Sequence, residues 1–191
     1  PHRFFADSAA SRCSFPVPPT GTYAVGMVFL PPDTDRRQRL EALIVNALQE
    51  EDLVLLGWRN VPVLSESAGP EARRTEPTIR QFFVARGNRD ELTFERCLFV
   101  ARKLCENRVR ILPLEERRHF YISSLSSRTI IYKGLLLPDQ IPRYFPDLNH
   151  PHFESALALV HSRFSTNTFP AWSLAHPFRM ICHNGEINTL K

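Results

Sequence analysis

The stretch YAVGMVFLPPDTDRRQRLEALIVNALQE, residues 23–50, decides the fold. Residues 23–30 form an unbroken apolar run closed by two prolines, which predicts a buried strand. After Asp35, the expected N-cap, apolar side chains recur every three or four residues, which predicts an amphipathic helix. These apolar positions are Leu40, Leu43, Ile44, Ala47 and Leu48. A strand followed directly by a helix indicates mixed α/β layers.

The same alternation continues as far as about residue 122. Strands are expected at 53–58, 79–85 and 120–125, with a second helix starting at Asp90 and a loop at 65–77. The resulting order, β-α-β-β-α-β, is that of the ferredoxin-like split βαβ unit. The order also suits an α/β insertion in a larger sheet, and the sequence does not choose between the two.

The segments before and after this region differ from it in composition and in the secondary structure that they predict. Residues 1–22, rich in Pro and Ser, predict an irregular lead-in, and the proline-rich segment 135–151 predicts extended, irregular chain. Residues 120–125 and 129–134 are expected to form a hairpin. Further strands are expected at 156–164 and 178–183, and a helix is expected to start just before residue 191.

Composition excludes several classes of protein. The chain has 191 residues and a net charge of +4, and only three of its 24 basic residues are lysines. The basic residues are dispersed along the chain, which argues against a surface that follows nucleic-acid phosphates. No apolar run approaches the roughly 18 residues of a membrane span, and there is no secretory signal. The four cysteines lack CxxC spacing, which predicts reduced thiols in a cytoplasmic protein.

Histidines gather in one part of the chain. Five of the seven lie between residues 150 and 183: His150, His152, His161, His176 and His183. A zinc site is one interpretation, but the spacing lacks H-x3-H or C-x2-C pairs, and Glu154 is the one carboxylate among them. A catalytic thiol at Cys182 with His183 as its base is a second. Neighbouring strand residues point to opposite faces, so Cys182 is expected instead to pack in the core beside Phe178 and Met180.

A third interpretation is a site for a carboxylate-bearing substrate and an oxyanion. Arg163, at the end of the strand expected at 156–164, is placed to pair with a carboxylate in bidentate fashion. Asn184 and Gly185 follow the next expected strand and begin a helix, and a side-chain amide beside a helix N-terminal N–H can bind an oxyanion. A surface position is the commoner role for an arginine at a strand end, and an ordinary Asn-Gly turn explains Asn184 and Gly185 equally well.

Longer motifs favour the third interpretation. The tract HSRFSTNTFPAWSLAHPFRMICHNGEINTLK, residues 161–191, resembles the class II, N-terminal-nucleophile glutamine amidotransferase domain of glutamate synthase large subunits. The tracts YAVGMVFLP at 23–31, FYISSLSSRTIIYKGLLLP at 120–138 and FESALALVHSRFSTNTFP at 153–170 resemble the same domain. The resemblance covers nearly all of the chain from about residue 23.

The resemblance implies roles for matching residues. Arg163 would hold the α-carboxylate of glutamine, with Phe164 and Thr166 lining the same pocket. Asn184 and the Gly185 N–H would form the oxyanion hole, and these two are the candidate catalytic residues. His176 would lie near the pocket, while His161 and His183 would give structural support.

The chain also departs from the family. The family attacks glutamine with an N-terminal cysteine whose own α-amino group is the base, whereas residue 1 here is Pro1. In the family the nucleophile lies upstream of the YAVGMVFLP tract, and an acidic residue that binds the substrate amino group lies beyond Lys191. We therefore expect an internal fragment of a longer protein that does not hydrolyse glutamine by itself.

The expected fold is α+β: part of an αββα sandwich of two antiparallel sheets. It would carry an α/β elaboration at 23–110 and the pocket-bearing sheet at 120–191. In the parent protein, the ammonia released from glutamine would combine with 2-oxoglutarate and be reduced to give glutamate. The resemblance implies FMN and an iron–sulfur cluster for other domains, none for this chain, and either a small subunit that oxidises NAD(P)H or ferredoxin as partner. The alternative is a non-catalytic module that binds glutamine.

Overall fold

A single four-stranded antiparallel sheet organises the computed structural model, which describes residues 1–12, 15–162 and 169–182. Its strands are β1 (Tyr23–Leu30), β2 (Val54–Asn60), β3 (Thr78–Ala85) and β4 (Tyr121–Ser126), in the order β2-β3-β1-β4. With α2 (Thr34–Glu50) after β1 and α4 (Glu91–Arg110) after β3, the element order and the antiparallel pairing are those of the split βαβ unit. The predicted α/β order is confirmed.

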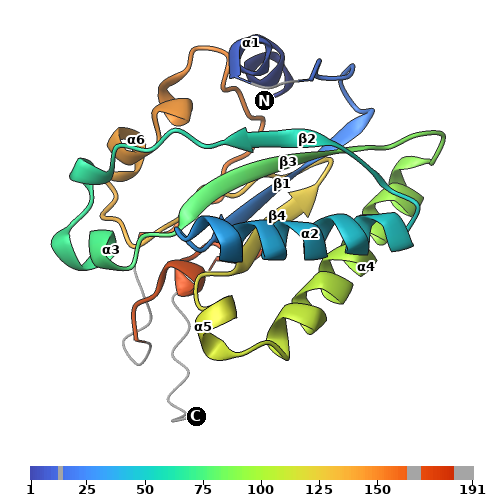
Figure 1. Cartoon of the computed structure of the whole chain (residues 1–191). Coiled ribbons are helices and arrows are strands. Elements are labelled where there is room, and N and C mark those ends of the chain that lie inside the picture. The colour runs from blue at the N-terminus through green and yellow to red at the C-terminus, as the bar shows by residue number, and fades with distance from the viewer. Residues whose placement is uncertain (13–14, 163–168, 183–191) are drawn as a thin grey trace.

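Helices α2 and α4 pack side by side on one face of the sheet (Figure 1). Alternate residues of β1, including Ala24 and Val28, point into this layer, where they meet Leu40 and Ile44 of α2 and Phe94 of α4. The N-cap of α2 is Asp33, which accepts the Arg36 N–H at 2.9 Å, so the predicted cap at Asp35 was two residues late. Asp90 caps α4 as expected, by accepting the Thr93 N–H.

The opposite face of the sheet is covered by α1 (His2–Arg12) and by the chain that follows β4 (Figure 1). Met27 and Phe29 pack there against Trp172 and Tyr144, which lie more than 100 residues further along the chain. All eight residues of β1 are therefore buried, because both faces of the sheet are covered. This double burial explains why β1 is continuously apolar rather than alternating.

The irregular lead-in predicted for residues 1–22 is wrong over α1. Phe4 and Phe5 are buried, and each packs edge-on against another aromatic ring, Phe153 and Phe83 respectively. Two adjacent phenylalanines give no helical period, and the contacts that hold the helix come from distant parts of the chain, so the sequence pattern did not reveal it.

Short helices also occur where loops or extended chain were expected. Pro70 starts α3 (Pro70–Arg74), after the turn η1 (Ser65–Ser67), and prolines lie in the first turns of α6 (Ile141–Tyr144) and η2 (Pro146–Asn149). A proline lacks an N–H that the first helical turn leaves unused, so it begins these helices rather than preventing them. The remaining short elements are α5 (Leu114–Arg117) and η3 (Trp172–Leu174).

The strands predicted after β4 are absent from the residues that the structure describes. At 129–134 no hairpin forms, because the Ile131 N–H donates to the Ser124 hydroxyl instead of a strand carbonyl. Residues 156–162 run as exposed chain with Leu157 and Val160 turned to solvent. At 178–182 a tight turn, closed by mutual Phe178 and Ile181 backbone hydrogen bonds, replaces the strand.

The described ranges consequently contain one sheet, and the second sheet of the expected sandwich remains an expectation. The helix expected before residue 191 lies outside the described residues. Among the helices described, none has both the length and the apolar character needed to cross a bilayer.

Candidate functional site

A cavity of about 560 Å³ opens on the face of the sheet opposite α2 and α4. Its wall combines the N-terminal helix, the end of β4 with the turn after it, the exposed segment 157–161 and the loop 176–179. The charged or ionisable side chains in this wall are those of histidines, arginines and tyrosines, and the described lining residues include no aspartate or glutamate. They are His2, Arg128, His161, His176 and Arg179, together with the tyrosines Tyr23 and Tyr132. Both arginines of the wall are paired with carboxylates of α4, Arg128 with Glu91 and Arg179 with Glu106.

Helix α4 fixes the turn at the end of β4. Glu95 accepts hydrogen bonds from the Ser127 N–H and hydroxyl, both at 2.6 Å, and from the Ser126 hydroxyl at 3.0 Å. One turn earlier, Glu91 accepts the Arg128 Nε–H at 2.6 Å. Residues 126–128 are thus held in the cavity wall by two carboxylates of α4, those of Glu91 and Glu95.

Two of the clustered histidines meet in the cavity wall. The rings of His161 and His176 are stacked, with centroids 4.5 Å apart and planes inclined by 28°. His176 also meets the ring of Phe178 at 4.6 Å, and its peptide bond to Pro177 is cis. The segments before and after residue 170 are therefore joined beside the cavity, as is also seen where the Cys182 thiol lies 3.9 Å from the Val160 carbonyl oxygen.

Lys133 is buried below the loop that carries His176. Its Nζ donates hydrogen bonds to the carbonyls of Ser173 at 2.9 Å and Ala175 at 2.8 Å. The same atom lies over the rings of Tyr121 and Phe178, 4.3 and 4.6 Å from their centroids. Burial, with a smaller contribution from Arg179, lowers the pKa of Lys133 to about 7.

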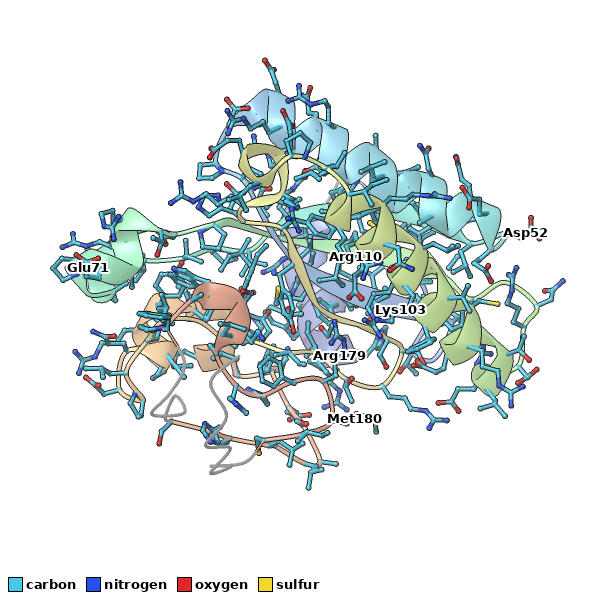
Figure 2. All side chains as sticks on the ribbon, turned by 90° about the horizontal axis from the view of Figure 1, so that it is seen from below. Asp52, Glu71, Lys103, Arg110, Arg179 and Met180 are labelled. Carbon is cyan, nitrogen blue, oxygen red and sulfur yellow. The ribbon has the colours of Figure 1, made fainter. Side chains whose placement is uncertain are left out.

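Arg179 fastens the far end of the same loop. It donates to the Glu106 carboxylate of α4 at 3.0 Å and to the Ile122 carbonyl at 2.9 Å, and its backbone φ is 37°, in the left-handed region. In Figure 2, Arg179 lies beside α4 and Met180 at the outer turn of the loop. Met180 is 81% exposed and Cys182 is only half-buried, so the expected packing of Cys182 in the core beside Met180 is wrong.

The predicted site residues divide into two groups. His176 lies in the cavity wall, with His161 stacked on it, and its place near a glutamine pocket stays a prediction. Arg163, Phe164, Thr166, Asn184, Gly185 and His183 lie outside the described residues. What the structure does show is that residues 157–161 and 176–179, which precede the two motif-bearing tracts, line one cavity.

The two other interpretations gain no support from the geometry. No group of three His, Cys, Asp or Glu side chains that could hold a metal ion occurs in the described part of the chain. His152 pairs with Asp7 instead. The described thiols Cys97, Cys105 and Cys182 are free, and burial raises the pKa of Cys105 to about 12, which keeps it protonated.

Comparison with known proteins decides the family. The family model for class II glutamine amidotransferases matches residues 1–191. The chain belongs to the class II glutamine amidotransferases. This membership confirms the resemblance to the class II amidotransferases.

The individual relatives are glutamate synthases. The NADPH-dependent large chain of Bacillus subtilis is 48% identical over 177 residues, which cover 92% of this chain and 11% of the relative. The NADH-dependent protein of Saccharomyces cerevisiae is 39% identical over 201 residues, which cover 100% of this chain and 9% of the relative. The chloroplastic ferredoxin-dependent protein of Oryza sativa is 39% identical over 192 residues, which cover 100% of this chain and 12% of the relative. The chain thus spans about a tenth of the length of these relatives.

Sequence reasoning missed Lys133, Arg179 and the Glu95 anchor. A signal for Lys133 was present, because a lysine within the apolar run IIYKGLLL is a charge that must be buried with partners. Arg179 and Glu95 gave no such signal. The partners of Arg179 lie at least 57 residues away in the sequence, and those of Glu95 at least 31.

Proposed function

We propose that the chain forms part of the glutamine amidotransferase domain of a glutamate synthase large chain. In this role the domain hydrolyses glutamine to glutamate and ammonia. The observation that carries the proposal is the 39–48% identity to glutamate synthases over about 90% or more of this chain. The cavity supports it, because its wall is built from the segments that lead into the two motif-bearing tracts.

Within this proposal the residues keep their expected roles. Arg163 pairs with the glutamine α-carboxylate, Phe164 and Thr166 line the pocket, and Asn184 with the Gly185 N–H stabilises the oxyanion of the tetrahedral intermediate. Donors of this kind typically contribute about 2.7–4 kcal/mol of transition-state stabilisation each. His176 borders the pocket, since it already lies in the cavity wall.

The nucleophile is a separate matter. The family mechanism requires a cysteine thiol beside a free α-amino group. Pro1 has no thiol, and the Cys105 thiol is held protonated within the packing of α4. We therefore expect a polypeptide of these 191 residues to show no glutaminase activity, whereas a mature large chain that begins with cysteine is active.

The later steps belong to the rest of the proposed large chain. Ammonia passes to 2-oxoglutarate, and reduction of the resulting imine gives the second glutamate, with FMN and an iron–sulfur cluster supplying the electron transfer. The described residues do not fit such a cluster, because their cysteines are dispersed and they hold no metal-binding group. We assign neither cofactor to this chain, and the electrons come from an NAD(P)H-oxidising small subunit or from ferredoxin. Free thiols fit a cytoplasmic location.

The test is Arg163→Gln in the large chain, with Arg143→Gln as the matched control. Arg143 is 70% exposed and pairs only loosely with Asp139, at 3.7 Å. Loss of a bidentate carboxylate pair should raise the KM for glutamine at least about tenfold, while the control stays within about twofold. An unchanged KM for Arg163→Gln would remove the proposed pocket.

A glutamine-binding module without catalysis is the second candidate, favoured by the cavity alone, because binding glutamine requires a pocket but no nucleophile. Sequencing the N-terminus of the mature native protein separates the two. A terminal cysteine supports the enzyme. A native chain that binds glutamine, lacks that cysteine and releases no ammonia supports the module.

A further inference from the structure

The loop 173–179 is fastened at two points, and neither fastening is a regular backbone ladder. At one end the Lys133 Nζ donates hydrogen bonds to the carbonyls of Ser173 and Ala175. At the other, Arg179 binds Glu106 and the Ile122 carbonyl. His176 and Pro177, which line the cavity, lie between these anchors.

The surroundings of Lys133 suit a compact hydrogen-bond donor. Two carbonyl oxygens and two aromatic faces, those of Tyr121 and Phe178, meet one nitrogen, and each presents negative charge to it. Lys133 itself is 1% exposed. The chain uses arginine at 21 of its 24 basic positions, so a lysine here meets a specific need for a small head group that fits between two carbonyls.

We propose that Lys133 is a positioning residue of the glutamine pocket, holding the 173–175 backbone against β4 so that His176 forms the cavity wall. This inference rests on the proposed function. Lys133 does not touch the substrate. It holds the loop 173–179, and this loop forms the cavity wall. Its effect falls on the use of glutamine, because displacing a binding wall by about 1 Å can lower the reaction rate about 100-fold.

Lys133→Met in the large chain tests the proposal, since methionine keeps the unbranched apolar stem and removes the donor. The KM for glutamine should rise at least about tenfold, while glutamate synthesis from free ammonia and 2-oxoglutarate stays within about twofold. Lys133→Gln keeps two N–H donors without the charge, so it should recover part of the loss and folds even if the methionine variant does not. Arg110→Met, which removes an exposed charge at the end of α4, should change neither activity.

Hydrogen exchange gives a readout that does not depend on activity. In Lys133→Met, amides between residues 172 and 182 should exchange at least about tenfold faster, while those of β1 and β3 keep their rates. Unchanged exchange, or faster exchange with an unchanged KM, overturns the positioning role. If the unmodified large chain itself shows no glutamine-dependent activity, the proposed function has failed, and exchange still decides whether Lys133 holds the loop.

Discussion

Replacing Asp147 by asparagine should strongly destabilise the chain. Asp147 accepts from both terminal nitrogens of Arg59, at 2.7 and 2.8 Å, and from the Tyr132 hydroxyl at 2.8 Å. Arg59 lies on β2, so this ion pair ties the edge strand of the sheet to the segment 141–149, and the two side chains are 0% and 3% exposed. Gln81 of β3 accepts from the same arginine.

The size of the effect follows from this geometry. At an effective dielectric constant of about 20, two unit charges about 4 Å apart attract each other by about 4 kcal/mol. Asparagine removes the negative charge and leaves the Arg59 guanidinium buried. Breaking one partner of a buried pair typically costs about 3–5 kcal/mol, and we expect the free energy of unfolding to fall by about this amount.

Urea unfolding of the 191-residue chain, followed by tryptophan fluorescence, measures the change. The control is Asp139→Asn, which removes an equivalent carboxylate from the exposed pair with Arg143 and should cost less than about 1 kcal/mol. If Asp147→Asn costs no more than the control, the buried pair does not hold the two segments together and the reasoning is refuted.

Other perturbations test the caps, the packing and the buried lysine. Asp33→Ala removes the cap of α2 and should lower the free energy of unfolding by about 1 kcal/mol in urea; a loss near zero would mean that the cap is dispensable. Gly134→Ala places a methyl group against the Trp172 ring, so it should shift the tryptophan emission and cost about 1–3 kcal/mol, and an unchanged spectrum would speak against this close packing. The unfolded Lys133 side chain binds a proton between pH 7 and 10 that the folded one, with its lowered pKa, does not, so folding gains stability as pH rises and loses it as pH falls toward 7. The free energy of unfolding of the native chain relative to Lys133→Met should therefore rise by up to about 1.4 kcal/mol per pH unit over this range; a flat difference would contradict it.

The part of the fold that the sequence predicted is the part in which each element carries its own local pattern. The strands β1 and β3 and the helices α2 and α4 follow apolar runs and a helical period that any packed layer requires. The strands expected after β4 failed for a different reason. The apolar run 156–160 forms a strand only if a neighbouring strand supplies backbone hydrogen bonds, and no strand of the described residues pairs with it.

The site was predictable only in outline. Histidine density and the motif tracts directed attention to 153–191, and His161 and His176 do meet at the cavity. The supports of the cavity were hidden, because Lys133 reaches across 40 and 42 residues to its carbonyl partners and Glu95 across 31 and 32 to its serines. Long-range hydrogen bonds of this kind leave no period or motif in the sequence.

The central claim is that residues 184 and 185 stabilise the oxyanion formed during glutamine hydrolysis in a glutamate synthase. The most direct measurement is the rate of glutamate synthesis by the Asn184→Ala large chain, driven in turn by glutamine and by free ammonia. Removing the Asn184 amide should remove about 2.7–4 kcal/mol of transition-state stabilisation. The kcat with glutamine should therefore fall by about 100- to 1000-fold, while the ammonia-driven rate stays unchanged. Equal rates with glutamine in the variant and the native enzyme would contradict the account.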